Sequence, residues 1–167
     1  MALLTYSPKD ITISLAGLHT ISGYVDGTFI KISKDVAPFK TAVAMDGETA
    51  RLFQEDGTYT VDITLAQSSS SNSVLSTLWN IDAATQLGKF PIFVRDGNGQ
   101  TTFFSAMSWI EQAPDVTFGK DIESRTWKFR CCYAGLTVGG AGNSSLIESA
   151  ILAGASFLPM LKSFGAF

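Results

Sequence analysis

The most regular stretch of the chain reads Thr58-Tyr59-Thr60-Val61-Asp62-Ile63-Thr64-Leu65. Apolar or aromatic side chains occupy every second position, and threonine or aspartate occupies the positions between them. Because successive side chains of a β-strand point to opposite faces of a sheet, this alternation predicts a strand. One face of that strand covers a hydrophobic core, and the other face stays polar.

The segment after this strand has the pattern of a helix. Serines 68–71 and Asn72 are of the residue types that cap helix N-termini. The apolar residues that follow recur at helical spacing and are Val74, Leu75, Leu78, Trp79 and Ile81. We expect one helix over about residues 73–85, with Gly88 just beyond its end. Trp79 lies on the apolar face of this helix and is expected to pack in the core.

The remaining strands are joined by turns. Extended or alternating patterns predict strands over residues 11–15, 18–22, 29–32, 90–95, 101–110 and 122–133. Asp96-Gly97-Asn98-Gly99 predicts a tight hairpin turn. In the last strand, one face is expected to carry Trp127, Phe129, Cys131 and Tyr133. The expected fold class is mainly β: an antiparallel β-sandwich or barrel with one flanking α-helix, a long protruding hairpin and a C-terminal apolar extension.

The long hairpin is predicted within residues 33–57, with arms over residues 41–45 and 49–54. Turn signals punctuate the segment at Pro38, Asp46-Gly47 and Asp56-Gly57. The segment has too few strong core residues to pack inside the domain. We therefore expect the hairpin to reach a neighbouring subunit. The candidate contact residues are Asp46, Gly47, Glu48 and Arg51.

The C-terminal extension begins after the glycine-rich stretch that ends at Asn143. We divide the chain into a β-barrel domain, residues 1–143, and an extension, residues 144–167. The extension is too apolar for a disordered tail. It is expected either to dock on a neighbouring subunit or to fold back on its own core. The candidate contact residues are Leu146, Ile147, Ile151, Phe157 and Phe164.

Composition limits the classes of function. The 167 residues fit one domain, and a charged fraction of only 16% suggests a surface that partners cover. The net charge of −3, without a run of lysine and arginine, argues against a protein that grips nucleic acid. No signal-peptide pattern is visible, and the apolar stretch 150–161 is interrupted and too short to span a bilayer. We expect no membrane anchoring.

No group of residues predicts a catalytic, metal or cofactor site, so we expect neither an enzyme nor a cofactor. His19 is the only histidine, and no nucleophile lies on a recognisable turn. Cys131 and Cys132 are adjacent, so they cannot form an ordinary disulfide with each other, and they lack the spacing of a zinc site. We interpret both cysteines as packing residues of a protein made in a reducing cytoplasm.

A series of short motifs runs through residues 10–143 in a definite order. The motifs are Asp26-Gly27-Thr28-Phe29-Ile30, Gly47-Glu48 with Arg51, Asp56-Gly57, Leu65-Ala66-Gln67-Ser68-Ser69, Ser71-Asn72-Ser73-Val74-Leu75-Ser76, Val94-Arg95-Asp96-Gly97 with Gly99, Trp109-Ile110, Pro114-Asp115 and Trp127. Each motif is ordinary by itself. As an ordered series, they resemble the tail tube protein family of contractile-tailed bacteriophages.

The resemblance implies a structural subunit of a virion tail, assembled in the host cytoplasm. Subunits of that family close into hexameric rings that stack into a tube, and strands of neighbours form an inner barrel. The implied partners are the chain itself, the tail sheath protein, the tape measure protein and DNA in the lumen, and baseplate and tail terminator proteins at the tube ends. A non-basic ring of about −18 charges would let DNA slide during ejection. The extension after Asn143 departs from the family pattern.

Two other functions are compatible with the sequence. A tube subunit of a tailocin or of a type VI secretion-like injection machine would share the fold but carry no genome. A carbohydrate- or receptor-binding β-sandwich would line a sugar site with Trp79, Trp109 and Trp127. The core positions expected for Trp79 and Trp127 disfavour the sugar site.

Overall fold

The computed structural model describes residues 6–140, and residues 1–5 and 141–167 lie outside the described part. The described elements are a short 3-10 helix (Pro8–Asp10), β1 (Ile11–Leu15), β2 (His19–Thr20), β3 (Ile30–Lys34), β4 (Phe39–Val43), β5 (Thr49–Phe53), β6 (Tyr59–Ala66), α1 (Ser71–Thr85), β7 (Phe90–Asp96), β8 (Thr102–Gln112) and β9 (Ser124–Thr137). All strand pairs are antiparallel. The expected class, mainly β with one flanking helix in the described part, is confirmed.

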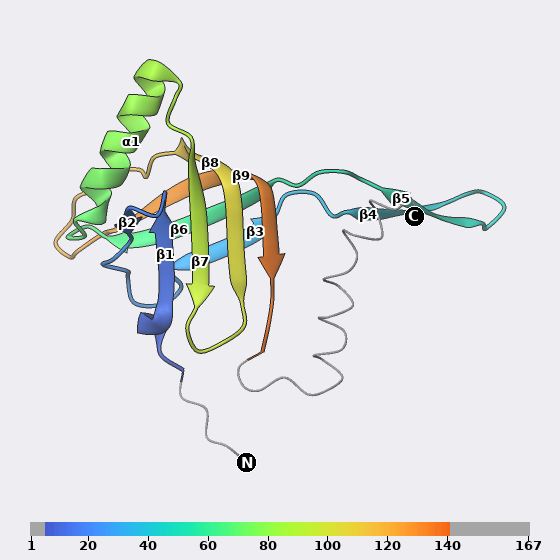
Figure 1. The fold of residues 1–167 in the computed structure, drawn as a ribbon, viewed down its shortest axis with the longest axis horizontal. Helices are drawn as coiled ribbons and strands as arrows, with labels where there is room; N and C mark the ends of the chain where they lie inside the picture. Colours follow the sequence, from blue (N-terminus) through green and yellow to red (C-terminus); the bar gives the residue numbers. More distant parts are fainter. Residues whose placement is uncertain (1–5, 141–167) are drawn as a thin grey trace, which may run out of the picture.

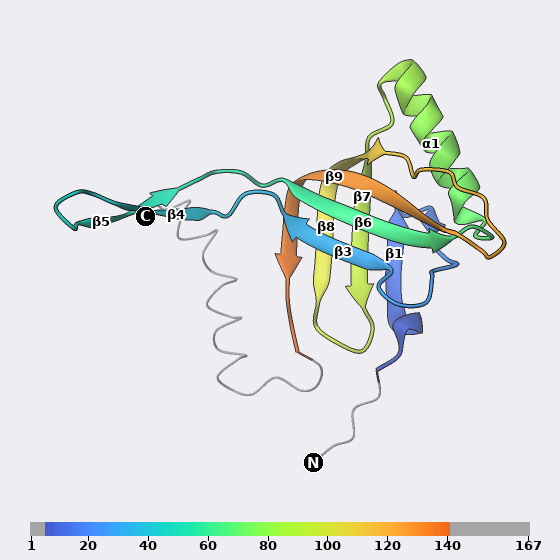
Figure 2. The same cartoon turned by 180° about the vertical axis from the view of Figure 1, so that it is seen from behind.

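One seven-stranded sheet forms the body, in the order β2-β1-β7-β8-β9-β6-β3. In Figures 1 and 2, β3 and β6 cross over the strands β1, β7 and β8, so the sheet folds over into two layers. β9 belongs to both layers, because its N-terminal half pairs with β6 while most of its length pairs with β8. Register shifts in the β7–β8 and β8–β9 pairs accompany this fold-over, as bulges bend strands.

The hydrophobic core fills the space between the two layers. Alternation in β6 is strict, and its apolar face, Tyr59, Val61, Ile63 and Leu65, is buried as predicted. Trp127, Phe129 and Cys131 face the same core from β9. Tyr133 does not, although the sequence predicted it there. Its φ of 50° breaks the alternation of β9, and its side chain is 79% exposed.

The helix α1 lies at one end of the sandwich (Figure 1). Leu75 is fully buried and Leu78 packs against the core. Asn72, in the first turn, accepts a hydrogen bond through Oδ1 from Trp127 Nε1 at 2.9 Å. Trp79 is 38% exposed, so the expectation that it packs in the core was wrong. Only a narrow side of the helix contacts the sheet, and Trp79 falls beyond that contact.

The predicted long hairpin is present and forms a separate two-stranded sheet of β4 and β5. It protrudes from one side of the body (Figures 1 and 2). Gly47 in its tip has a φ of 88°, which glycine adopts without strain. The tip is closed by the Glu48 backbone N–H, which donates to Asp46 Oδ1 at 3.1 Å. In the described part, no helix is long and apolar enough to cross a membrane.

Candidate functional site

The hairpin exposes apolar side chains on both of its faces. Phe39 and Phe53 are cross-strand partners on one face, and Leu52 lies on the other beside Lys40. Val43 and Phe53 are about two-thirds exposed, at 67% and 66%, and Met45 at the tip is fully exposed. An isolated two-stranded hairpin is marginally stable in water, and exposed apolar patches usually mark an interface.

Local aromatic contacts give the hairpin some stability of its own. The ring centroids of Phe39 and Phe53 lie 5.5 Å apart. The Arg51 guanidinium lies 3.4 Å from the Phe39 ring centroid, a cation–π contact. The structure therefore places Asp46, Gly47 and Glu48 together in the tip, with Arg51 further back on β5. Whether these four residues contact a neighbour remains a prediction.

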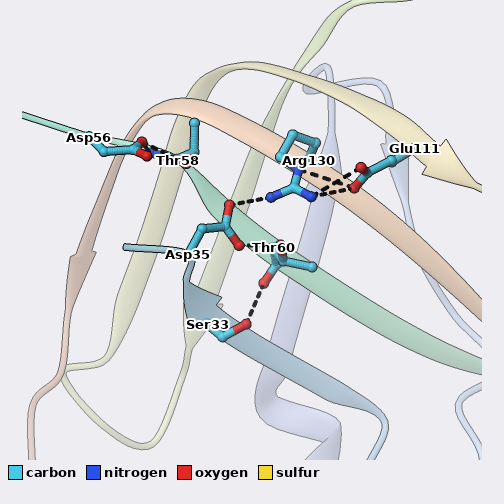
Figure 3. A network of polar contacts seen from close by, with 7 residues as sticks. All are labelled: Ser33, Asp35, Asp56, Thr58, Thr60, Glu111 and Arg130. Carbon is cyan, nitrogen blue, oxygen red and sulfur yellow. Dashed lines mark hydrogen bonds and ion pairs between the residues drawn. The ribbon is translucent and has the colours of Figure 1, made fainter. Parts of the chain in front are cut away.

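A polar network holds the base of the hairpin to the body (Figure 3). Arg130 on β9 donates from Nε and Nη2 to the Glu111 carboxylate on β8, at 3.1 and 3.0 Å. Its Nη1 forms an ion pair with Asp35, just after β3, where the chain enters the hairpin. Thr60 Oγ1 on β6 donates to Asp35 Oδ1 at 2.6 Å. Residues of four strand regions therefore meet at one point.

The other end of the hairpin is held in a similar way. Asp56 Oδ1 accepts hydrogen bonds from the backbone N–H and the hydroxyl of Thr58, at 2.9 and 2.7 Å. The Asp35 backbone N–H donates to the Thr58 carbonyl at 3.2 Å. The two chain segments that lead into and out of the hairpin are thus joined to each other. This geometry fixes the direction in which the hairpin leaves the body.

The network also shifts the ionisation of its members. Burial alone would raise the pKa of Asp35, but hydrogen bonds from Thr60, Arg130 and Thr58 together outweigh burial and lower the pKa below its usual value. Hydrogen bonds from Thr58 lower the pKa of Asp56. The Glu111 carboxylate, helped by Asp35, raises the pKa of Arg130. All three groups are therefore charged at neutral pH.

Sequence reasoning missed this network. The alternation of β9 placed Arg130 on the outward face, but nothing local pairs it with Asp35, 95 residues away. The available signals were the scarcity of charges in the chain and the aspartates at either end of the hairpin, Asp35 and Asp56.

A groove of about 900 Å³ lies between α1 and the outer face of β8 and β9. Its aromatic and apolar lining includes Trp79, Met107, Trp109 and Tyr133. Cys132 also lines the groove, whereas Cys131 points into the core. Burial raises the pKa of the Cys131 thiol to about 12. Cys131 is therefore a packing residue, as predicted, while Cys132 lies on an accessible surface.

The lone histidine has a structural contact. His19 Nε2 lies 3.1 Å from Ser71 Oγ, at the first residue of α1. Ser71 is fully buried, and its Oγ also accepts a hydrogen bond from the Ser22 backbone N–H. A substrate cannot reach that hydroxyl. Among residues 6–140, no three carboxylate, imidazole or thiol groups gather closely enough to hold a metal ion.

Comparison with known proteins finds a similar phage protein and a shared fold. The chain is 28% identical over 130 residues to structural protein ORF10 of Pseudomonas phage KPP10, covering 74% of this chain and 75% of that protein. No protein-family model matches the chain.

Two solved structures share the fold. The tube-terminating cap of the anti-feeding prophage has a TM-score of 0.51 and 9% identity, covering 83% of this chain and 94% of that chain. The sheath/tube terminator of PVC, an extracellular contractile injection system, in its extended state has a TM-score of 0.50 and 10% identity, covering 83% and 100%. This chain is thus similar to a phage structural protein and has the fold of terminators of contractile systems.

Proposed function

We propose that this chain is a structural subunit of the tail tube of a contractile-tailed phage, forming stacked hexameric rings whose lumen conducts the genome. The observation that carries the proposal is the protruding hairpin β4–β5, which exposes apolar side chains on both faces. Similarity to a phage structural protein supports the class of protein. The ring and the tube come from the family resemblance of the motif series.

The hairpin is the proposed contact between rings. Its tip presents Asp46, Gly47 and Glu48, and Arg51 flanks the exposed Phe39–Phe53 pair. Burial of such apolar groups against a neighbour would stabilise assembly by about 25 cal/mol for each Å² removed from water. The Arg130 network holds the hairpin in a defined direction, which lowers the conformational entropy lost on docking.

The geometry suits head-to-tail assembly. In a head-to-tail arrangement, the projecting hairpin of one copy meets a different surface on the next copy. Such heterologous contacts generate rings or stacks that extend. A tube of stacked rings needs contacts within each ring and contacts between successive rings.

The C-terminal segment is a second proposed contact. The proposal divides the chain into a domain, residues 1–143, and an extension, residues 144–167, that contacts another subunit. The candidate residues Leu146, Ile147, Ile151, Phe157 and Phe164 lie outside the described residues.

The proposed function also implies a location and further partners for the chain. The tube would lie in the virion tail after assembly in the host cytoplasm, surrounded by the sheath protein. Tape measure protein and DNA would occupy the lumen, and baseplate and terminator proteins would bind the tube ends. The role is structural, without catalysis, cofactor or membrane anchor. A tube of a tailocin or secretion machine differs only in carrying no DNA, which sequencing of nucleic acid from purified particles would decide.

A tube terminator is the second candidate function. The specific observation in its favour is the fold shared with two terminators over nearly their whole length. A terminator would lie only at the end of a tube, whereas a tube subunit would recur along its length.

Electron microscopy of the purified full-length protein tests the proposal. We expect hollow tubes of variable length, and a variant lacking residues 45–53 should form no stacks. Single rings that never stack would favour the terminator, and stable monomers at high concentration would overturn both functions. Tubes of normal length from the variant would remove the hairpin from the ring contact.

A further inference from the structure

The outer faces of the two layers differ in character. On the layer of β3, β6 and the first half of β9, the outward residues are polar, including Thr60, Asp62, Lys128 and Arg130. On the layer of β7, β8 and the second half of β9, large apolar residues are exposed. They are Phe93, Phe104, Met107 and Tyr133. A polar face is stable in water, whereas an exposed apolar face of this kind usually marks an interaction site.

The exposed residues form one continuous surface. Phe93 on β7 and Phe104 on β8 are cross-strand partners, and Phe104 is also opposite Gly135 on β9. A side chain added at Gly135 would meet no atom within 4 Å, so the space over it is open. Further along the same strands, Met107 and Tyr133 lead into the groove beside Trp79. We name this surface, from Phe93 and Phe104 to Trp79, the outer apolar face.

The described chain ends next to this face. The Gln100 backbone N–H donates to the Gly140 carbonyl at 3.2 Å, and Thr101 Oγ1 donates to the Gly139 carbonyl at 3.2 Å. Both contacts hold the end of β9 beside the β7–β8 turn. Six residues of strand, about 20 Å, separate Gly139 from Tyr133. Residues 141–167 span about 40 Å as a helix and about 90 Å when extended, enough to cross the whole face.

The composition of residues 141–167 suits binding to an apolar surface. Within residues 141–167, only Glu148 and Lys162 are charged. The large apolar residues are Leu146, Ile147, Ile151, Leu152, Phe157, Leu158, Met160, Leu161, Phe164 and Phe167. The hairpin of another copy suits the face less well, because it carries Lys40, Asp46, Glu48 and Arg51 within a few residues.

We infer that residues 146–164 dock on the outer apolar face and fill the groove between α1 and strands β8 and β9. The first part of the segment passes over Phe104 and Gly135, and the later part reaches Tyr133 and Trp79. The docking does not depend on the formation of a tube.

Cys132 provides a native probe in the groove. Single cysteines are introduced into the full chain as Leu146→Cys, Ile151→Cys, Phe157→Cys and Phe164→Cys, and the proteins are oxidised with copper phenanthroline. We expect a disulfide with Cys132 for the later positions and its loss when Cys132→Ser is added, since Cys131 is buried. No disulfide above the Cys132→Ser control at any position would overturn the docking.

The size of the crosslinked product identifies the copy that provides the segment. A fast-migrating monomer on a non-reducing gel places the segment on its own body and contradicts the subunit contact proposed above. A dimer places it on a neighbour. Either product supports docking on this face. Tubes without any crosslink would leave the proposed function standing and reject the docking, so the two failures differ.

Tryptophan fluorescence gives an independent measurement. Trp79 and Trp109 line the groove, whereas Trp127 is buried. In the full-length double variant Phe157→Glu, Leu158→Glu, acrylamide quenching should increase. The matched control, Ser156→Glu and Ser163→Glu, adds the same charge without removing apolar groups and should change quenching less. Equal quenching in wild type and the Phe157, Leu158 variant would contradict the inference.

Discussion

Arg130 and Asp35 form an ion pair between the strand that joins the two layers and the point where the hairpin leaves the body. The residues are 95 positions apart in the chain, and both side chains are partly exposed to solvent. The pair therefore connects the base of the protruding hairpin with the outer surface of the body.

Loss of the Asp35 charge should weaken the folded state modestly. Asp35→Asn removes the ion pair with Arg130, and partly exposed pairs of this kind contribute about 1 kcal/mol. Urea denaturation should show a decrease of that size in the free energy of unfolding. Asp46→Asn, at the exposed hairpin tip, is the control and should change little. An equal loss in both variants would contradict the anchoring role of Asp35.

Acid should remove the same contribution. The folded-state pKa of Asp35 is below its usual value, because its hydrogen bonds and ion pair outweigh the effect of burial. Its contribution is therefore fully present above the unfolded pKa of about 4 and is lost as the pH falls through the folded pKa. We would measure the difference in free energy of unfolding between wild type and Asp35→Asn at several pH values. The difference should be constant from about pH 6 to 8 and smaller at about pH 3. A difference that grows in acid would refute this assignment.

Removal of the hairpin should separate assembly from folding. β4 and β5 form their own sheet, and the core residues lie outside them. Deletion of residues 45–53 should abolish tubes while leaving the circular dichroism spectrum and the cooperative unfolding of the body nearly unchanged. The milder pair Phe53→Ser and Thr41→Ser tests the apolar contact itself, and only the first should impair assembly. Loss of cooperative unfolding on deletion would show that the hairpin is part of the folding unit.

Truncation after Asn143 tests the extension as a subunit contact. Tubes should become less stable to dilution, measured by sedimentation, because an apolar contact has been removed. A matched truncation of the full chain by only its last residue, Phe167, should have a smaller effect. Unchanged ring and tube stability after the longer truncation would reject the contact.

The two cysteines should react at very different rates. Cys131 is buried with its pKa raised to about 12, so it stays protonated, whereas Cys132 lines the groove. A thiol-specific chromogenic reagent at pH 8, the assay pH, should modify one cysteine in the native protein and both in urea. Cys132→Ser should abolish the fast phase. Two fast thiols in the native protein would contradict the burial of Cys131.

Local patterns predicted those features that depend on neighbours in sequence. The alternation of residues 58–65 gave β6, and the turn Asp96-Gly97-Asn98-Gly99 joins β7 and β8 as expected. The burial of Trp79 was not predictable, because periodicity identifies the apolar stripe of a helix but not how much of that stripe the sheet covers. The exposure of Tyr133 was not predictable from alternation either. Its left-handed backbone conformation reverses which of the following residues of β9 face the core.

Contacts between distant segments were not predictable from these patterns. The ion pair of Arg130 with Asp35 requires β9 to lie next to β6, and β6 next to β3. Such an order of non-consecutive strands is set by the packing of the whole core. The candidate contact residues of the hairpin tip were found because turn signals are local, and their role stays a prediction.

The position of β9 in both layers has a mechanical consequence. The hairpin continues directly into β6, which is joined to β9 by eight cross-strand pairs, from Tyr59 opposite Cys131 to Ala66 opposite Ser124. A pull on the hairpin along the axis of β6 would load these pairs in shear, so that they resist together instead of opening one after another like a zipper. The fold would therefore transmit tension from the β4–β5 hairpin through β6 and β9 into both layers of the sheet.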